Sequence, residues 1–176
     1  MAMSTRITTT LAASAFLIVG GLLVACATLG LRFNSTSSMP LGFYRIAPGA
    51  VTRGAYVTAC LPPDNPFVTL IRARLYEHDG SCASGLTPLI KPVAAVAGDH
   101  VTLTTHSVYV NGVELKGSAT LPRDGIGRPL PSWPRGTYNV APGTVWLVST
   151  YSPRSLDSRY FGPVPTSAIQ HVMRKL

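Results

Sequence analysis

The segment Val101–Leu115 decides the fold class of this chain, because it reads VTLTTHSVYVNGVEL. Apolar and polar residues alternate on both sides of Asn111-Gly112, and this arrangement is the strongest short-range signal of a β-hairpin. Two further runs on either side of this segment are β-branched and aromatic and are bounded by Gly and Pro: Val51–Val57 and Val145–Val148. Both runs are expected to be strands.

One helix is expected over Asn65–His78, where Asn65-Pro66 offers an N-cap and a first-turn proline. Residues Gly117–Arg135 are rich in Gly, Pro and Arg and are expected to form a surface loop. The sequence therefore predicts a mainly β chain, built as a folded-over sheet or an incomplete barrel.

The N-terminal run Leu11–Leu31 carries no charge and, at about 1.5 Å per residue, can span a bilayer core. The predicted domains are residues 1–32, a cytoplasmic start and transmembrane anchor, and residues 33–176, a single exported domain. Two alternatives stay open: Ala25-Cys26-Ala27 is typical of a signal-peptide cleavage site, and Leu23–Cys26 resembles a lipobox that would leave Cys26 lipidated. All three interpretations export the rest of the chain.

The net charge is +8, from 15 Lys and Arg against 7 Asp and Glu, and the arginines are spread along the chain. Because no basic run is interleaved with aromatic residues, the sequence argues against nucleic acid as a partner. The excess charge suits a face beside an anionic membrane instead.

Cys60 and Cys82 fit neither a CxxC redox motif nor a zinc pattern. In an exported domain they are expected to form a structural disulfide, the alternative being two unpaired thiols. The sequence contains no metal-ligand cluster and no phosphate-binding Gly loop, so neither metal nor cofactor is expected.

A cluster of hydroxyls, Ser35–Ser38, follows the apolar run and is stopped by Pro40. A serine nucleophile needs a base. The histidines, His78, His100, His106 and His171, have no recognisable catalytic context, although a histidine base remains possible because triad partners are adjacent only in space.

Lysine can serve as the base when burial lowers its pKa. Lys116 and Lys175 have polar surroundings, whereas Lys91 shares one face of the predicted strand Leu89–Val93 with its apolar ends. The alternative is a lysine that extends to solvent at a sheet edge. Pro92 cannot donate a ladder hydrogen bond, which predicts that this strand lies at an edge or beside a cleft.

Four segments, in this order, resemble the conserved boxes of type I signal peptidases, and most closely those of the conjugative-transfer branch, the TraF peptidases. They are Ser38-Met39-Pro40, Lys91 with Val93–Val101, Val108–Gly112 and Ser155–Val164. The resemblance covers most of residues 34–165. It implies a signal-peptidase-like β domain facing the periplasm from the bacterial inner membrane, with a conjugative pilin precursor as substrate.

The resemblance also implies site roles. Ser38 would be the nucleophile, with Ser37 as a competitor because it has the proline spacing of ordinary signal peptidases. Lys91 would be the general base, and Asp157 the acidic residue of this branch, unless pairing with Arg159 is its whole role. The Ser38 N–H and the Thr36 hydroxyl would hold the oxyanion, and Ser155 would orient the lysine amine.

The chain departs from ordinary signal peptidases at Ser149–Ser152, which stand where that family has Gly-Asp-Asn-Arg. This departure favours a specialised enzyme that processes, and in this branch can cyclise, one precursor. The alternatives are a general type I signal peptidase that cleaves many leaders, a non-enzymatic scaffold of a secretion or pilus assembly, and a lipoprotein binding module anchored at Cys26.

Overall fold

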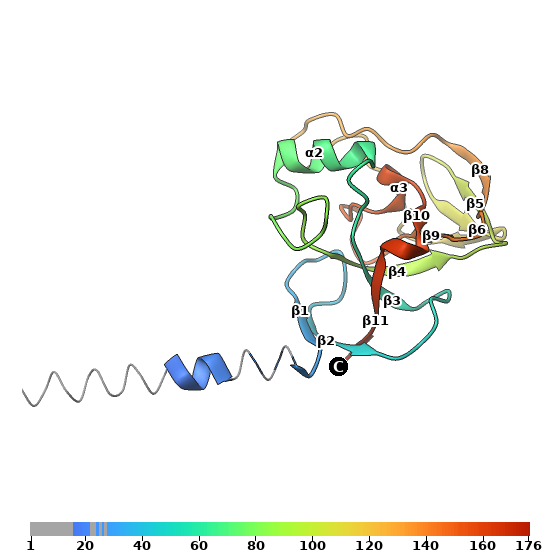
Figure 1. The fold of residues 1–176 in the computed structure, drawn as a ribbon. Helices are drawn as coiled ribbons and strands as arrows, with labels where there is room; N and C mark the ends of the chain where they lie inside the picture. The colour runs from blue at the N-terminus through green and yellow to red at the C-terminus, as the bar shows by residue number, and fades with distance from the viewer. Residues whose placement is uncertain (1–15, 22–23, 25, 27) are drawn as a thin grey trace, which may run out of the picture.

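The computed structural model describes residues 16–21, 24, 26 and 28–176, which form two β-sheets flanked by short helices (Figure 1). The elements from Leu31 onward are β1 (Leu31–Asn34), β2 (Gly42–Ala47), β3 (Tyr56–Ala59), α2 (Pro66–Arg74), β4 (Leu89–Ala95), β5 (His100–Leu103), β6 (Val108–Val110), β7 (Val113–Leu115), β8 (Gly136–Asn139), β9 (Thr144–Leu147), α3 (Ser158–Phe161), β10 (Val164–Pro165), the 3₁₀ helix Thr166–Ala168 and β11 (Ile169–Lys175).

The larger sheet has seven strands in the order β1-β2-β11-β3-β4-β9-β10. Its two edge strands do not pair with each other, so the sheet is open and curled and does not close into a barrel (Figure 1). A second sheet of four strands has the order β7-β6-β5-β8. The predicted mainly β architecture with an incomplete barrel is confirmed.

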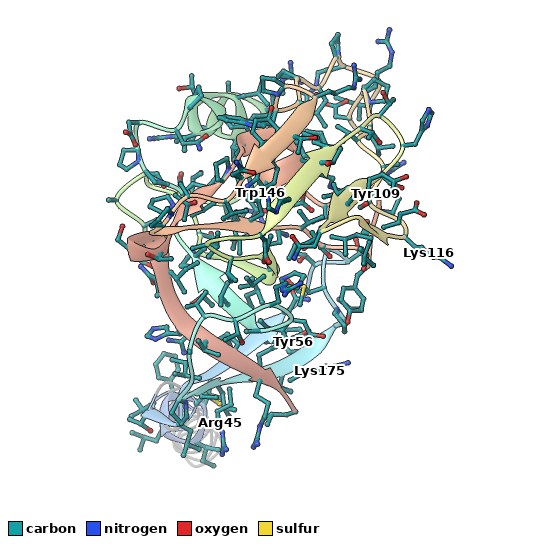
Figure 2. All side chains as sticks on the ribbon, turned by 90° about the vertical axis from the view of Figure 1, so that its right-hand side faces the viewer. Arg45, Tyr56, Tyr109, Lys116, Trp146 and Lys175 are labelled. Carbon is teal, nitrogen blue, oxygen red and sulfur yellow. A yellow bond between two sulfur atoms is a disulfide. The ribbon has the colours of Figure 1, made fainter. Side chains whose placement is uncertain are left out.

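The hairpin that decides the fold class is β6 and β7, in which Val108 pairs with Leu115. Asn111 and Gly112 form its turn with φ angles of 51° and 78°, the left-handed values that a tight hairpin turn requires. On β5 and β6, alternate residues face inward and pack against Trp146 of β9, which Figure 2 labels. The hairpin thereby joins the small sheet to the large one.

Three expectations need correction. Asn65 caps α2 as predicted, but the helix ends at Arg74 because Leu75 turns into the left-handed region with φ 54°. The strand expected from Val51 starts only at Tyr56, because a turn around Gly54 precedes it. Residues 117–135 are irregular as predicted, yet Leu130 is buried in the core, so part of this loop is structural.

The predicted membrane anchor, Leu11–Leu31, falls partly outside the described residues, which omit positions 11–15, 22, 23, 25 and 27. In the segments that the structure does describe, no helix has the length and apolar character needed to cross a bilayer. Strand β1 begins at Leu31, which is also the last residue of the predicted anchor run.

Candidate active site

Lys91 lies on the buried face of β4, where burial alternates residue by residue and Lys91 falls between Leu89 and Val93. The predicted shared face is confirmed. The predicted edge position is wrong, because β4 pairs with both β3 and β9, with a register shift between Val93 and Ala95. The alternative of a strand beside a cleft holds, since Lys91 lines a cavity of about 150 Å³.

The hydroxyl cluster forms the connection between β1 and β2, and Met39 fixes it to the domain. The Met39 side chain is 1% exposed and packs in a small core with Tyr44 and Met173. The Tyr44 hydroxyl also donates a hydrogen bond to the Pro40 carbonyl at 2.8 Å. The residues on both sides of this anchor, including Ser38, are therefore held in one place.

Asn34, the last residue of β1, organises the same connection from inside. Its buried amide nitrogen donates to the carbonyl oxygens of Thr36, Met39 and Pro40 at 2.9, 3.2 and 3.2 Å. Its amide oxygen accepts from the Thr36 backbone N–H at 3.3 Å and from the Thr36 hydroxyl at 2.9 Å. One side chain thus sets the curvature of the loop that carries Ser38.

Ser38 and Lys91 meet at the cavity. The Lys91 Nζ donates to the Ser38 Oγ at 2.8 Å, and the Ser38 Oγ lies 3.0 Å from the Thr36 Oγ1. A chain of hydrogen bonds therefore runs from Lys91 through Ser38 and Thr36 to Asn34. Ser37, the competing nucleophile, is exposed and is not among the hydrogen-bond partners of Lys91 in the described part of the chain.

Lys91 is 3% exposed, and burial lowers the pKa of its amine from the ordinary value of 10.5. The carboxylates of Asp157 and Glu77 oppose this shift and the Arg159 guanidinium adds to it. Because burial dominates, the neutral amine is accessible at a lower pH than in an exposed lysine.

Asp157 and Arg159 form the predicted ion pair, and both side chains are fully buried. The Arg159 Nε and Nη2 donate to the two carboxylate oxygens of Asp157 at 2.8 and 2.7 Å. Arg159 also donates to the backbone carbonyls of Ala119, Ser149 and Ser155. The Asp157 carboxylate additionally caps α3. Each charged group of this pair therefore has several hydrogen-bond partners, and these bonds hold the surrounding backbone in place.

Ser149 connects that pair to the Ser38 loop. Its backbone N–H donates to the Asp157 carboxylate at 3.0 Å, and its hydroxyl donates to the Ser38 carbonyl oxygen. Within the described residues, Asp157 makes no hydrogen bond to Ser38 or Lys91. Its geometric link to them is therefore indirect, through Ser149 and through the field that it exerts on the Lys91 amine.

Two hydroxyls had predicted roles, Thr36 as a donor to the oxyanion and Ser155 as the group that orients the lysine amine. Thr36 contacts Ser38, but its hydrogen is donated to Asn34, so here it acts on the orientation of Ser38 and not as a free donor. The Ser155 Oγ is buried and, among the residues that the structure describes, has no hydrogen-bond partner. Its predicted bond to the lysine amine is not formed in this conformation.

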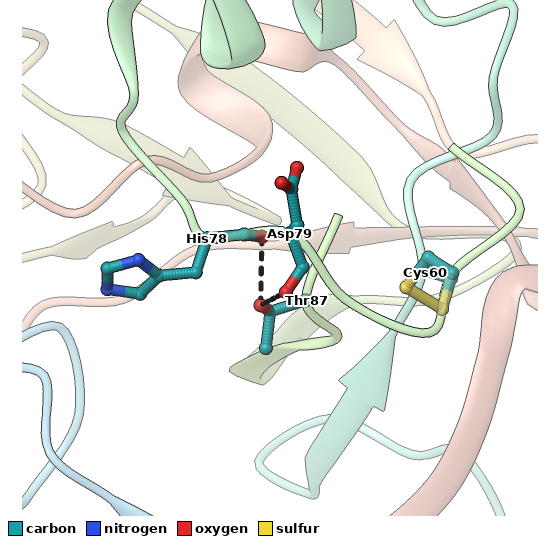
Figure 3. Close-up of a disulfide and its surroundings, with 5 residues drawn as sticks. Cys60, His78, Asp79 and Thr87 are labelled. Atoms are coloured by element: carbon teal, nitrogen blue, oxygen red, sulfur yellow. Dashed lines mark hydrogen bonds between the residues drawn. A yellow bond between two sulfur atoms is a disulfide. The ribbon is translucent and has the colours of Figure 1, made fainter. Parts of the chain in front are cut away.

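Of the histidines, His78, His100 and His106 are exposed and His171 is half-buried on β11. His78 also lines the cavity. The predicted disulfide between Cys60 and Cys82 is present (Figure 3). Over the described ranges, no group of acidic, His and Cys side chains could hold a metal ion. The sequence reasoning missed three residues of the site: Asn34, Ser149 and Glu77. Ser149 reaches Ser38 through a long-range contact, whereas Asn34 acts within its own loop on residues 36–40.

The sequence matches the family described as signal peptidase, peptidase S26, over residues 4–174. It is 37% identical over 161 residues to a plasmid transfer protein TraF of Escherichia coli, covering 92% of this chain and 88% of that protein. It is 43% identical over 144 residues to a probable conjugal transfer protein TraF of Sinorhizobium fredii (strain NBRC 101917 / NGR234), covering 80% of this chain and 73% of that one. A solved signal peptidase I of Enterococcus faecalis V583 is similar with a TM-score of 0.42 at 17% identity, covering 73% of this chain and all of that one.

Proposed function

The chain belongs to the signal peptidase family, peptidase S26, and is similar to TraF proteins; we propose that it is a serine endopeptidase with Ser38 as nucleophile and Lys91 as general base. Its substrate is a pilin precursor of a conjugation system. The observation that carries the proposal is the 2.8 Å contact between the Ser38 Oγ and a lysine amine that is buried on an apolar strand face.

The chemistry follows from the state of that amine. Burial favours neutral Lys91, whose lone pair can take the Ser38 hydroxyl proton as the Ser38 Oγ attacks the scissile carbonyl. The resulting ammonium returns this proton to the leaving amine, and an acyl ester on Ser38 remains. Water, or an amine of the substrate itself, then attacks the ester. Attack by the substrate's own amino terminus would release a cyclic product.

The remaining side chains supply positioning in this proposal. Asn34 and Thr36 orient the Ser38 hydroxyl, and Ser149 fixes the Ser38 carbonyl. Asp157, held by Arg159, anchors Ser149 and stabilises the protonated form of Lys91 that appears after proton transfer. The backbone N–H of Ser38 would stabilise the oxyanion. No metal or cofactor takes part in these steps.

The proposal includes an anchor in residues 1–32 and a periplasmic domain over residues 33–176. Support comes from the outer face of β1, β2 and β11. There the rings of Phe33 and Phe43 are 61% and 51% exposed and stack edge to face, with centroids 5.0 Å apart. Arg45 pairs in register with Arg174 beside them, and Figure 2 shows Arg45 at this end of the domain. Exposed aromatic and basic side chains together suit a bilayer interface.

The test is co-expression of the full chain with a candidate pilin precursor, followed by intact-mass measurement of the product. Wild type, Lys91→Ala and the matched control Lys116→Ala are compared, since Lys116 is exposed directly after β7 and does not line the cavity. We expect a trimmed product with wild type and Lys116→Ala and none with Lys91→Ala. A product lighter by one water than the linear peptide would add cyclisation.

Unchanged processing with Lys91→Ala would overturn the assignment of the base and return the question to a histidine or to a scaffold role. A second precursor, an unrelated secretory protein with its own leader, separates the specialised enzyme from a general signal peptidase. We expect the unrelated leader to stay uncleaved.

A further inference from the structure

The cavity that holds Ser38 and Lys91 has a second wall, formed by the segment that follows α2. Glu77 and His78 line it together with residues of the Ser38 loop and with Lys91. The segment reaches the cavity because Leu75 ends α2 with a left-handed turn and redirects the chain. A carboxyl group therefore borders the same small space as the proposed nucleophile and base.

This wall is braced. The disulfide between Cys60 and Cys82 ties the end of the segment to the end of β3. Across the segment, the backbone N–H and the hydroxyl of Thr87 both donate to the His78 carbonyl oxygen at 3.0 Å, and Figure 3 shows the hydroxyl bond beside the disulfide. The neighbouring residues Asp79 and Leu86 form a β-bridge. Glu77 is thus presented from a fixed loop.

Glu77 itself has no hydrogen bond and no ion pair with any described residue, although its side chain is half-buried. Burial raises the pKa of its carboxyl group, and the charges of Lys91 and His78 oppose that rise. In the working state proposed above Lys91 is neutral, so Glu77 loses its main cationic neighbour. The Glu77 carboxyl group is therefore open, at the cavity, to a charged or hydrogen-bonding partner from outside the chain.

We infer that Glu77 binds a primary ammonium group of the substrate in this cavity, next to the acyl ester on Ser38. The inference rests on the proposed function and names a recognition element of the same site. Two parts of a peptide carry such a group: the amino terminus of the chain that accepts the acyl group, and a lysine side chain of the chain that is cleaved. A carboxylate recognises either one by a charge-assisted hydrogen bond.

With the amino terminus as ligand, Glu77 also serves the transfer step. The ammonium gives one proton to the Glu77 carboxylate, and the neutral amine attacks the ester carbonyl. The new C–N bond forms as the C–Oγ bond breaks, and the second amine proton passes through Lys91 to the Ser38 Oγ. The products are an amide and free serine, and Glu77 returns its proton to solvent.

The experiment uses the full chain and a peptide that spans the processing site of a pilin precursor, with glycinamide as the added amine. Mass spectrometry measures the ratio of amide to acid product, which depends only on events after the acyl ester has formed. Glu77→Gln is compared with Glu77→Asp, which keeps the charge, and with Glu114→Gln, since Glu114 does not line the cavity. A parallel arm compares kcat/KM for peptides with lysine or norleucine near the scissile bond.

We expect Glu77→Gln to lower the amide-to-acid ratio about tenfold, with partial retention in Glu77→Asp and the wild-type ratio in Glu114→Gln. This result identifies the acceptor amino terminus as the ligand. An unchanged ratio with loss of the preference for lysine over norleucine identifies the side chain instead. If neither quantity changes, the inference about Glu77 is overturned while cleavage by Ser38 stands. Cleavage that survives Ser38→Ala would overturn the proposed function as well.

Discussion

Arg159 and Lys91 are both cationic side chains inside this domain, with exposures of 0% and 3%, yet their surroundings differ. The Arg159 guanidinium donates hydrogen bonds to a carboxylate and to three backbone carbonyls. The Lys91 amine donates to a single serine hydroxyl on an otherwise apolar face. Arg159 therefore has a direct ion-pair partner, whereas Lys91 has none among the described residues and is acted on by Asp157 and Glu77 only from a distance.

This difference in partners distinguishes a residue that stabilises the fold, Arg159, from one that can take part in proton transfer, Lys91. A buried charge with saturated partners keeps its ordinary protonation state and holds the structure together. A buried charge without them shifts its pKa and becomes a group that can exchange protons near neutral pH. The carboxylates repeat the pattern, because Asp157 is saturated by Arg159 and Ser149 whereas Glu77 has no partner among the described residues.

Removing the compensated cation should cost the most stability. Arg159→Met leaves the Asp157 carboxylate buried and unpaired, so we expect the free energy of unfolding to fall by about 3–5 kcal/mol. Denaturant unfolding of the purified protein measures this change. The double variant Arg159→Met, Asp157→Leu should recover a large part of the loss, because it leaves no isolated charge. A smaller loss is expected for Arg128→Met, because its partner Asp124 keeps the hydrogen bond from the Tyr76 hydroxyl and the ion pair with Arg74. If Arg159→Met lowers the free energy of unfolding no more than Arg128→Met does, the structural role assigned to the buried Arg159–Asp157 pair is contradicted.

The link between the two regions is the Ser149 hydroxyl. Ser149→Ala removes its hydrogen bond to the Ser38 carbonyl oxygen, and we expect kcat to fall about tenfold with little change in KM. Ser167→Ala, at an exposed position of the 3₁₀ helix, is the control. A rise in KM with kcat unchanged would mean that Ser149 shapes substrate binding and does not position Ser38.

The smallest effect has the opposite sign to that of Arg159→Met. Lys91→Met replaces an uncompensated amine with an apolar side chain of similar size, and we expect the free energy of unfolding at neutral pH to rise by about 1 kcal/mol. Because the folded-state pKa of Lys91 is lowered, the unfolded chain binds more protons between that pKa and 10.5. Wild-type stability therefore rises with pH through this window, and the advantage of Lys91→Met shrinks. An advantage that is independent of pH would show that packing and not charge is responsible. Lys116→Met should show no advantage.

Local sequence signals predicted those parts of the fold that depend on neighbours in the chain. The Asn111-Gly112 turn, the Asn65 cap and the alternation around Lys91 needed only short-range information. The position of β4 inside the sheet did not follow from Pro92, because the pairing with β9 starts only after it, at Val93.

Local sequence signals could not predict site residues whose contacts join distant parts of the chain. Ser149 and Ser38 are 111 positions apart, and nothing in the local sequence of Ser149 indicates that its hydroxyl meets the Ser38 carbonyl. Asn34 ends a strand, and no local motif indicated that it takes part in the site. Glu77 was expected inside a helix that in fact stops at Arg74, so its place at the cavity was not predicted. Segment order and the family resemblance brought Ser38 and Lys91 into one hypothesis, and the tertiary contacts supply their neighbours.

The most direct test of the central claim is the rate at which a processing-site peptide acylates Ser38, followed by intact mass from neutral to alkaline pH. We predict that the wild-type rate rises with pH through a midpoint below 10.5, the ordinary lysine value, because the neutral amine is the base. Lys91→Ala should lower the rate by about 10²–10⁴-fold and remove this rise. A variant that keeps both the rate and the pH profile of the wild type would contradict the account.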